Sequence, residues 1–410
     1  MAQLPNREVM QMSANAHRVL VAGAGVAGLE TALALRELAP GRADVELVAP
    51  ESAFVHRPLA VAEPFRVGEV RRFPLDRLVA AAGARLRRGT LADLDWERRT
   101  VQLADGETLD YETLVLALGA EPVEAIPGAL TFRGPQDGAA VSELLGRATG
   151  GELKRIVFAL PTGATWPLPL YELAFLTSAY LTERMTRGVD VVVVTPEERP
   201  LAEFGQAASD AIEHLLELRG IQLETAAVAR LWENGALELA DGRRIAADAV
   251  VSLPRLRGRP IGGLPQDENG FVATDEFGWV LGLTDVYAAG DLTQVPIKQG
   301  GIAAQQADAV ASAIAADLGA HTRPTEFRPV LRGLLLTGGP PHFLRADPDR
   351  HSSVESTQPL WWPPGKIVGR HLTPFLAEQL GLRADYPEPP HETAVLIELG
   401  VETPARSRAG

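Results

Sequence analysis

The sequence contains no cysteine, and this absence excludes several kinds of chemistry. Structural disulfides, thiolate-bound metals, iron–sulfur clusters on protein ligands and cysteine-based redox relays all require thiols. The eight histidines are dispersed and include no pair at positions i and i+4, so we expect no metal site. A GxSxG elbow of the kind found in hydrolases is also missing from the sequence.

Positive charge and long apolar runs are scarce as well. The 410 residues include 39 Lys and Arg against 53 Asp and Glu, a formal charge of −14, which argues against nucleic acid as a partner. Prolines and a glycine interrupt the most apolar stretch, residues 156–171, so we expect no membrane span and leave peripheral membrane contact open. Residues 1–16 lack the pattern of a secretory signal and predict a loose tail, and we expect a cytoplasmic protein.

The first clear pattern is a strand, a glycine turn, a helix and a second strand within about 35 residues. The apolar run at residues 17–22 predicts a buried parallel strand, and residues 29–39 have helical periodicity. Residues 45–49 predict the second strand. This order is typical of the βαβ unit that binds dinucleotides.

The turn of this unit reads GAGVAG. Gly23 would permit the tight turn, Gly25 would let the backbone approach a pyrophosphate, and Gly28 would allow close packing of helix on strand. The helix start, with Val26 and Ala27, would supply backbone amides and the positive end of the helix dipole. The pattern therefore predicts a dinucleotide site.

A second unit of the same kind is less complete. Residues 156–160 predict a strand, 168–188 a helix and 189–196 another strand. The connecting turn has one glycine, Gly163, where a nucleotide-binding turn has two or three. We therefore expect a second Rossmann-like domain and leave its ability to bind NAD(P)H open.

Beyond these units, residues 300–318 are alanine-rich and predict a helix. Prolines and aromatic residues become more frequent from His321, which predicts a small third domain or an extended arm.

Three motifs carry a family resemblance: GAGVAGLETA at residues 23–32, TLVLALGAEP at 113–122 and DVYAAGDLT at 285–293. In this order they resemble the FAD-dependent pyridine nucleotide–disulfide oxidoreductase superfamily. Within it, the sequence is most similar to sulfide:quinone oxidoreductases and type II NADH dehydrogenases, over residues 17–382. The resemblance implies an enzyme of the oxidoreductase class with FAD as cofactor.

The expected fold is α/β, with two Rossmann-like three-layer domains and a small C-terminal domain. After the tail at 1–16, we expect a discontinuous FAD-binding domain at 17–122 and 243–320. We expect an NAD(P)-binding-like domain with a degenerate fingerprint at 123–242 and the C-terminal domain or arm at 321–410.

The resemblance also implies which residues contact FAD. Asp291 would bind the ribityl chain, and the segment FVHRPLA at 54–60 would run along the isoalloxazine. Lys298, at the start of the last helix, is a candidate for stabilising the reduced flavin, although a solvated surface lysine is the alternative. The full expected set is Gly23, Gly25, Val26, Ala27, Gly28, Glu51, Arg57, Pro58, Ala117, Gly119, Gly290, Asp291, Lys298 and Gln299.

The sequence departs from the family pattern in three places. Ala49 stands where most dinucleotide sites have an acidic residue, and Glu51 is the candidate substitute, with an exposed loop carboxylate as the alternative. The missing cysteines exclude the thiol relay of sulfide:quinone oxidoreductases and disulfide reductases. In the second domain, bulky residues replace the turn glycines, which argues against NAD(P)H, whereas Glu172 matches a glutamate of NADH-using relatives.

The candidate residues for an NAD(P) or acceptor site are Gly163, Trp166, Glu172, Glu197, Trp361 and Trp362. For the two C-terminal tryptophans, the alternative is that they pack the small domain.

We therefore expect a FAD-dependent oxidoreductase that transfers two electrons from NAD(P)H or a small-molecule donor to a quinone or other acceptor. A flavoprotein that oxidises an organic substrate without NAD(P)H is a second hypothesis. A flavin-binding protein for partner recognition or redox sensing is a third. The sequence does not decide whether the protein forms a homodimer.

Overall fold

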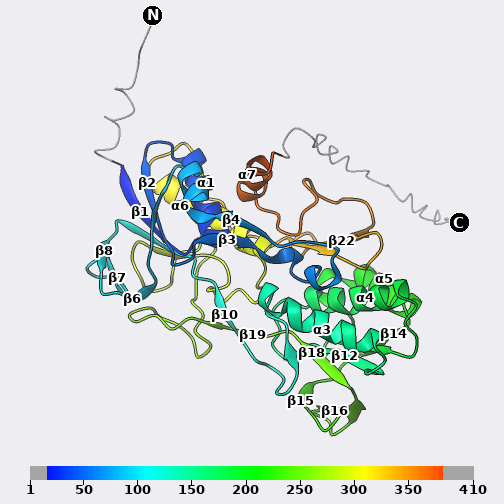
Figure 1. The fold of residues 1–410 in the computed structure, drawn as a ribbon. Coiled ribbons are helices and arrows are strands. Elements are labelled where there is room, and N and C mark those ends of the chain that lie inside the picture. The colour runs from blue at the N-terminus through cyan, green and yellow to red at the C-terminus, as the bar shows by residue number, and fades with distance from the viewer. Residues whose placement is uncertain (1–15, 382–410) are drawn as a thin grey trace, which may run out of the picture.

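The computed structural model describes residues 16–381 (Figure 1). Its first sheet is parallel and has the strand order β20-β9-β1-β2-β5. These strands are β1 (His17–Ala22), β2 (Ala43–Val48), β5 (Arg85–Arg87), β9 (Thr113–Leu116) and β20 (Val286–Ala288). Helices α1 (Val26–Leu38) and α6 (Gly300–Asp317) pack together on one face of this sheet.

Strand alternation explains the two faces of the first sheet. Val19 and Val21 point into the core shared with α1 and α6, whereas Leu20 and Ala22 point to the opposite core. That second core lies under an antiparallel meander of β6 (Leu91–Asp95), β7 (Thr100–Leu103) and β8 (Thr108–Asp110). The first domain thus has three layers.

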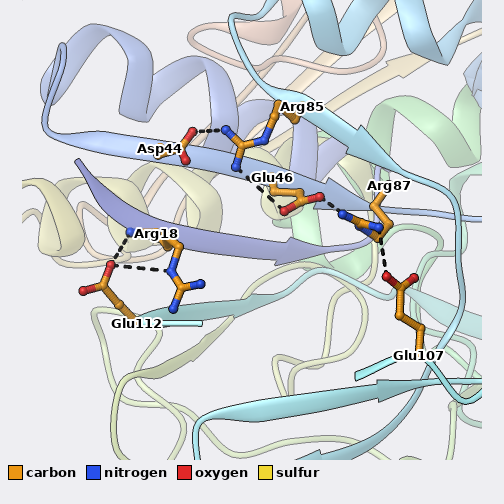
Figure 2. Close-up of polar contacts among 7 residues, drawn as sticks. All are labelled: Arg18, Asp44, Glu46, Arg85, Arg87, Glu107 and Glu112. Carbon is orange, nitrogen blue, oxygen red and sulfur yellow. Dashed lines mark hydrogen bonds and ion pairs between the residues drawn. The ribbon is translucent and has the colours of Figure 1, made fainter. Parts of the chain in front are cut away.

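Beyond this apolar region, the strands carry a row of charged side chains (Figure 2). Glu46 on β2 pairs with Arg87 at 3.0 Å and with Arg85 at 3.8 Å, and Arg85 also pairs with Asp44. Arg87 continues the row to Glu107 at 2.9 Å. These pairs are partly exposed and each contributes at most about 1 kcal/mol. Charges along β5 also make this edge strand a poor template for pairing with another chain.

The second sheet is also parallel, with the order β11-β18-β12-β13-β14. Its strands are β11 (Leu130–Thr131), β12 (Arg155–Ala159), β13 (Asp190–Val194), β14 (Ile221–Glu224) and β18 (Ala249–Ser252). The helices that share its main core are α3 (Gly138–Thr149), α4 (Leu168–Glu183) and α5 (Gln206–Leu218). A small sheet of β15 (Ala229–Glu233), β16 (Ala236–Leu239) and β17 (Arg244–Ala246) packs on the other face.

The second sheet corrects one expectation. Strand β18 pairs with β12 through Ala249–Ser252, so the expected return to the first domain at residue 243 comes too early. The chain leaves the first domain along β10 (Ala120–Val123) and returns along β19 (Arg255–Gly258), and these two strands pair with each other. Strand β18 could not be assigned to the second sheet from sequence, because a short apolar run fits either sheet.

The C-terminal part adds an antiparallel sheet of β21 (Leu331–Leu335), β22 (His342–Asp347) and β23 (Ser352–Ser356), followed by α7 (Leu372–Gln379). The α/β fold with two parallel sheets and a small C-terminal unit is therefore confirmed. The remaining elements are β3 (Ala53–His56), β4 (Arg71–Pro74) and α2 (Leu75–Ala81), with 3₁₀ turns at Arg57–Leu59, Glu63–Phe65, Pro135–Asp137 and Ala202–Phe204. Between residues 16 and 381, no helix is long and apolar enough to cross a membrane. Residues 1–15 of the tail expected at 1–16, and residues 382–410 of the C-terminal arm, lie outside the described residues.

Candidate active site

A cavity of about 550 Å³ lies where the two parallel sheets and the C-terminal segment meet. The first domain contributes the glycine turn after β1, the second contributes the first turn of α4, and the C-terminal part contributes Arg332–Leu334 with Lys366 and Ile367. Ligands of parallel α/β sheets bind outside the carboxyl ends of the strands, which is where this cavity lies.

The three glycines of the first turn have distinct geometric roles. Gly23 has φ +110°, and a Cβ there would lie 2.1 Å from the Ala117 carbonyl oxygen. A Cβ on Gly28 would lie 1.9 Å from the Gly23 carbonyl oxygen, so Gly28 permits close packing within the turn. Gly25 lines the cavity, and a Cβ there would meet no protein atom within 4 Å.

Thirteen of the fourteen residues expected at the cofactor line this cavity. The exception is Gly28, which packs inside the turn. The residues brought together are Gly23, Gly25, Val26, Ala27, Glu51, Arg57, Pro58, Ala117, Gly119, Gly290, Asp291, Lys298 and Gln299.

Lys298 is buried, with 6% of its surface exposed, so the alternative of a solvated surface lysine is wrong. Its Nζ donates to the Thr293 carbonyl oxygen and lies 4.0 Å from the centre of the Phe271 ring. Burial lowers the pKa of Lys298 to about 8, and the charge of Asp291 opposes this shift. Burial raises the pKa of Asp291, against the charges of Lys298 and Arg57.

Gln299 has a role that the sequence did not predict. Its Oε1 accepts the backbone N–H groups of Gly301 and Ile302 and so caps helix α6. Two of the first amides of α6 are therefore used within the protein. Helix α6 therefore contributes to the cavity the positive end of its dipole and the lining residue Gly300.

Glu172 is completely buried and forms an ion pair across the cavity wall. Lys366 Nζ lies 2.5 Å from both carboxylate oxygens of Glu172, and the Leu336 amide donates to Oε1 at 2.9 Å. Burial raises the pKa of Glu172, and Lys366 opposes the shift. Sequence reasoning missed Lys366, although the chain contains only Lys154, Lys298 and Lys366 as lysines and two of these line the cavity.

Glu197 does not line the cavity, and its carboxylate binds groups of its own domain. Its Oε2 accepts the Tyr171 hydroxyl at 2.6 Å and the Thr195 hydroxyl at 2.7 Å, and its Oε1 accepts the Leu201 amide at 3.0 Å. Burial, together with the charge of Glu197, raises the pKa of the neighbouring Glu203 to about 7. The expectation that Glu197 belongs to a donor or acceptor site is therefore not supported by its position.

Of the other candidates for an NAD(P) or acceptor site, one lines the cavity and three do not. Trp166 lines the cavity and packs edge-on against Phe204 at 5.7 Å. Gly163, Trp361 and Trp362 are not among the lining residues. Trp361 packs against Phe343 at 5.0 Å and donates to the Gly365 carbonyl at 2.9 Å, which is the alternative in which it packs the small domain.

Sequence reasoning also missed a cluster of two carboxylates and a histidine, none of which lines the cavity. Donor atoms of Glu30, Asp308 and His371 lie within 4.8 Å of one another. Both oxygens of Glu30 accept backbone amides, from His371 and Leu372, so this carboxylate already has protein partners. The three residues come from α1, α6 and the start of α7, and nothing in their sequence spacing indicates that they meet.

The chain is similar in sequence to a known family and to proteins of known name. The sequence profile of a family described as pyridine nucleotide-disulphide oxidoreductase matches residues 17–156 and 174–307. An NADH dehydrogenase-like protein of Mycobacterium tuberculosis (strain CDC 1551 / Oshkosh) is 30% identical over 297 residues, covering 67% of this chain and 72% of that protein. The rubredoxin-NAD(+) reductase of Alcanivorax borkumensis is 26% identical over 303 residues, covering 68% and 73%.

Two solved structures show the same fold at low identity. The sulfide:quinone oxidoreductase of Aquifex aeolicus superimposes with a TM-score of 0.76 at 20% identity, covering 83% of this chain and 87% of that one. NDH2 from Plasmodium falciparum, solved with NADH, superimposes with a TM-score of 0.56 at 15% identity, covering 68% and 64%.

Proposed function

The chain belongs to the pyridine nucleotide-disulphide oxidoreductase family, and from this we propose that it passes two electrons through FAD from NAD(P)H or another small-molecule donor to a quinone or other small acceptor. It is an oxidoreductase of a family that typically binds FAD and NAD(P)H. The single observation that carries the proposal is one cavity shared by the glycine turn, the first turn of α4 and Lys366.

The residues of the first domain fit FAD. Gly25 leaves open space beside the turn, and the start of α1 has no side-chain cap, so its amides are free to bind a pyrophosphate. Arg57 and Lys298 place positive charge along the same wall. When bound, FAD supplies the two-electron chemistry, and the protein supplies binding and electrostatics.

Two groups of this chain are suited to charge and proton handling. Lys298, with the dipole of α6, provides positive charge where a reduced flavin would carry negative charge. Glu172 and Lys366 hold a proton between them at the cavity wall, and quinone reduction takes up protons. Because the chain has no cysteine, electrons do not pass through a protein thiol.

A second candidate function is direct oxidation of an organic substrate without NAD(P)H. It is favoured by the turn before α4 and by the first turn of α4, where Pro161, Pro167 and Pro169 have no backbone N–H to offer a phosphate. The bulky Trp166 also lines the cavity at this turn, where a close approach of the backbone to a nucleotide would favour glycine. Glu197, a candidate residue for the NAD(P) site, accepts hydrogen bonds from Tyr171 and Thr195 instead.

The domain division is part of the proposal. We assign the FAD-binding domain to residues 17–122 and 253–320, the second domain to 123–252 and the C-terminal unit to the residues from 321 onward. The two parallel sheets and the paired crossing strands support these bounds. A cytoplasmic location and a homodimer stay predictions.

Anaerobic titration of the purified holoprotein tests the proposal. Flavin absorbance at about 450 nm is followed while NADH or NADPH is added, with dithionite as the control reductant. Rapid bleaching by a nicotinamide supports the first candidate. Bleaching by dithionite alone argues against a nicotinamide donor and leaves another small-molecule donor or the second candidate, and failure of the protein to retain any flavin would refute both.

A further inference from the structure

Two fully buried glutamates hold the ends of a seven-residue segment, Lys366–Leu372, which we call the strap. At one end, Glu172 on α4 of the second domain binds the Lys366 ammonium. At the other end, Glu30 on α1 of the first domain binds the backbone amides of His371 and Leu372, each at 2.7 Å. The strap therefore joins both domains at the cavity.

The strap forms part of the cavity wall. Lys366 and Ile367 line the cavity, and Ile367 packs on Gly300 at the start of α6, where a Cβ would lie 2.9 Å from Ile367. A shift of the strap would therefore move a cation and an apolar side chain that face any acceptor in this cavity.

Glu30 contacts the strap backbone closely. A Cβ on Gly369 would lie 2.6 Å from Glu30 Oε2, so the chain passes directly over the carboxylate at this glycine. The Gly369 amide donates to the Thr373 hydroxyl at 2.8 Å, which closes the turn into α7. The two amides that Glu30 accepts are at the start of α7, so Glu30 caps that helix from another element.

The strap places two basic side chains close to acidic groups of α1 and α6. The strap brings Arg370 and His371, and the His371 ring lies 3.1 Å from Glu37 of α1 and 3.7 Å from Asp308 of α6. A buried carboxylate is costly unless hydrogen bonds compensate it, and the strap amides supply them. Elsewhere α1 and α6 contribute mainly alanine, leucine and valine to their shared core, so Glu30 is not needed to fill it.

We propose that Glu30 is a positioning residue for the acceptor side of the cavity. By holding the amides of His371 and Leu372, it fixes Lys366 and Ile367 in the wall, so the helix that presents the glycine turn also sets the acceptor pocket. This inference rests on the proposed function, since it assumes that an apolar acceptor such as a quinone enters beside the strap.

The test compares Glu30→Gln with Glu37→Gln, a matched control on the same helix that touches the His371 ring and not the strap backbone. Hydrogen exchange of the peptide containing His371 and Leu372 is the first readout. We expect exchange about tenfold faster in Glu30→Gln and within about twofold of wild type in Glu37→Gln. Unchanged exchange in Glu30→Gln, or equal acceleration in both variants, would overturn the anchoring role.

The second readout is reoxidation of the dithionite-reduced holoprotein by decylubiquinone and by ferricyanide. In Glu30→Gln we expect the half-saturating concentration of decylubiquinone to rise about fivefold with the limiting rate within about twofold, and the ferricyanide rate to stay constant. Equal slowing with both oxidants, or no change with either, contradicts the positioning role.

A second variant guards against a folding defect in Glu30→Gln. Gly369→Ala leaves every charge in place but pushes the strap from the Glu30 carboxylate, so it should produce the same selective effect on decylubiquinone. If the wild-type protein retains no flavin, the proposed function fails and the positioning role fails with it, whereas hydrogen exchange still decides whether Glu30 anchors the strap.

Discussion

Gly25→Ala should separate cofactor binding from folding. Gly25 has φ −80° and ψ −161°, an extended conformation that alanine adopts freely. The new methyl group would meet no protein atom within 4 Å and would project into the space where the glycine turn faces the cavity. The fold should therefore tolerate the change, whereas the approach of a pyrophosphate to the backbone should not.

The expected magnitude follows from the hydrogen bonds at risk. Displacing the pyrophosphate by a methyl radius breaks one charge-assisted hydrogen bond to a turn amide, worth about 1.5–3 kcal/mol. Since 1.4 kcal/mol corresponds to a tenfold change in Kd, FAD affinity should fall by roughly ten- to 150-fold. The free energy of unfolding of the FAD-free protein should change by less than about 1 kcal/mol, and toward stability, because alanine restricts the unfolded chain.

The assay needs two matched controls. Gly28→Ala brings a Cβ within 1.9 Å of the Gly23 carbonyl oxygen and should destabilise the FAD-free protein. Gly146→Ala, in the last turn of α3 and facing open space, should not lower stability and should not change FAD binding. FAD is removed from each protein, and its affinity is measured by calorimetric titration. Stability of each FAD-free form is measured by urea unfolding.

One result would refute the reasoning. If Gly25→Ala binds FAD with wild-type affinity, the glycine turn does not contact the pyrophosphate, and the assignment of this cavity to a dinucleotide is wrong. If Gly25→Ala unfolds as readily as Gly28→Ala, the open space at Gly25 is not what the structure indicates, and loss of FAD would carry no information about the turn.

Three further predictions concern the charged groups. Burial and the charge of Glu30 raise the pKa of Asp308 from 3.8 to about 8, so the folded protein binds an extra proton and the free energy of unfolding falls as the pH rises from 4 to 8. In urea unfolding, the free energy of unfolding of Asp308→Asn should fall less steeply with pH than that of the wild type, by up to about 1.4 kcal/mol per pH unit. The same pH dependence in both proteins would contradict the raised pKa. Lys366→Met leaves Glu172 buried without a counter-charge and should lower the free energy of unfolding by about 3–5 kcal/mol in the same assay, so a loss below about 1 kcal/mol would argue against the buried pair. Lys298→Met removes a buried cation from the cavity wall and should lower the flavin midpoint potential by about 30 mV, as measured by equilibration with a reference dye; an unchanged potential would exclude Lys298 from flavin tuning.

Local patterns in the sequence were sufficient to predict the first strand, the last helix and the glycine turn of the first domain. The strand at 17–22 matches β1, and the predicted helix at 300–318 matches α6 to within one residue. The glycine spacing predicted the geometry of Gly23 and Gly28 because a tight turn and a close helix–strand contact impose their constraints within a few residues. The family resemblance then predicted which segments meet at the cavity.

Side-chain direction was decided by the tertiary structure. Glu197 has the right residue type three residues after the end of β13, yet it accepts hydrogen bonds from Tyr171 and Thr195 inside its own domain. Gln299 was expected at the cofactor and does line the cavity, but its amide oxygen caps α6. Residue type and spacing predict where a side chain begins, and its partners depend on which groups the fold leaves unsatisfied.

The sequence by itself determined the main strands and helices of the two Rossmann-like units, their order and the dinucleotide turn, because periodicity and turn chemistry act over short stretches of chain. Only the tertiary structure decided which charges meet. Glu30 and His371 are 341 residues apart in sequence, and Glu172 and Lys366 are 194 apart, and no local pattern links them. Such pairs form because a buried carboxylate must find donors after the domains have packed, wherever the chain brings those donors.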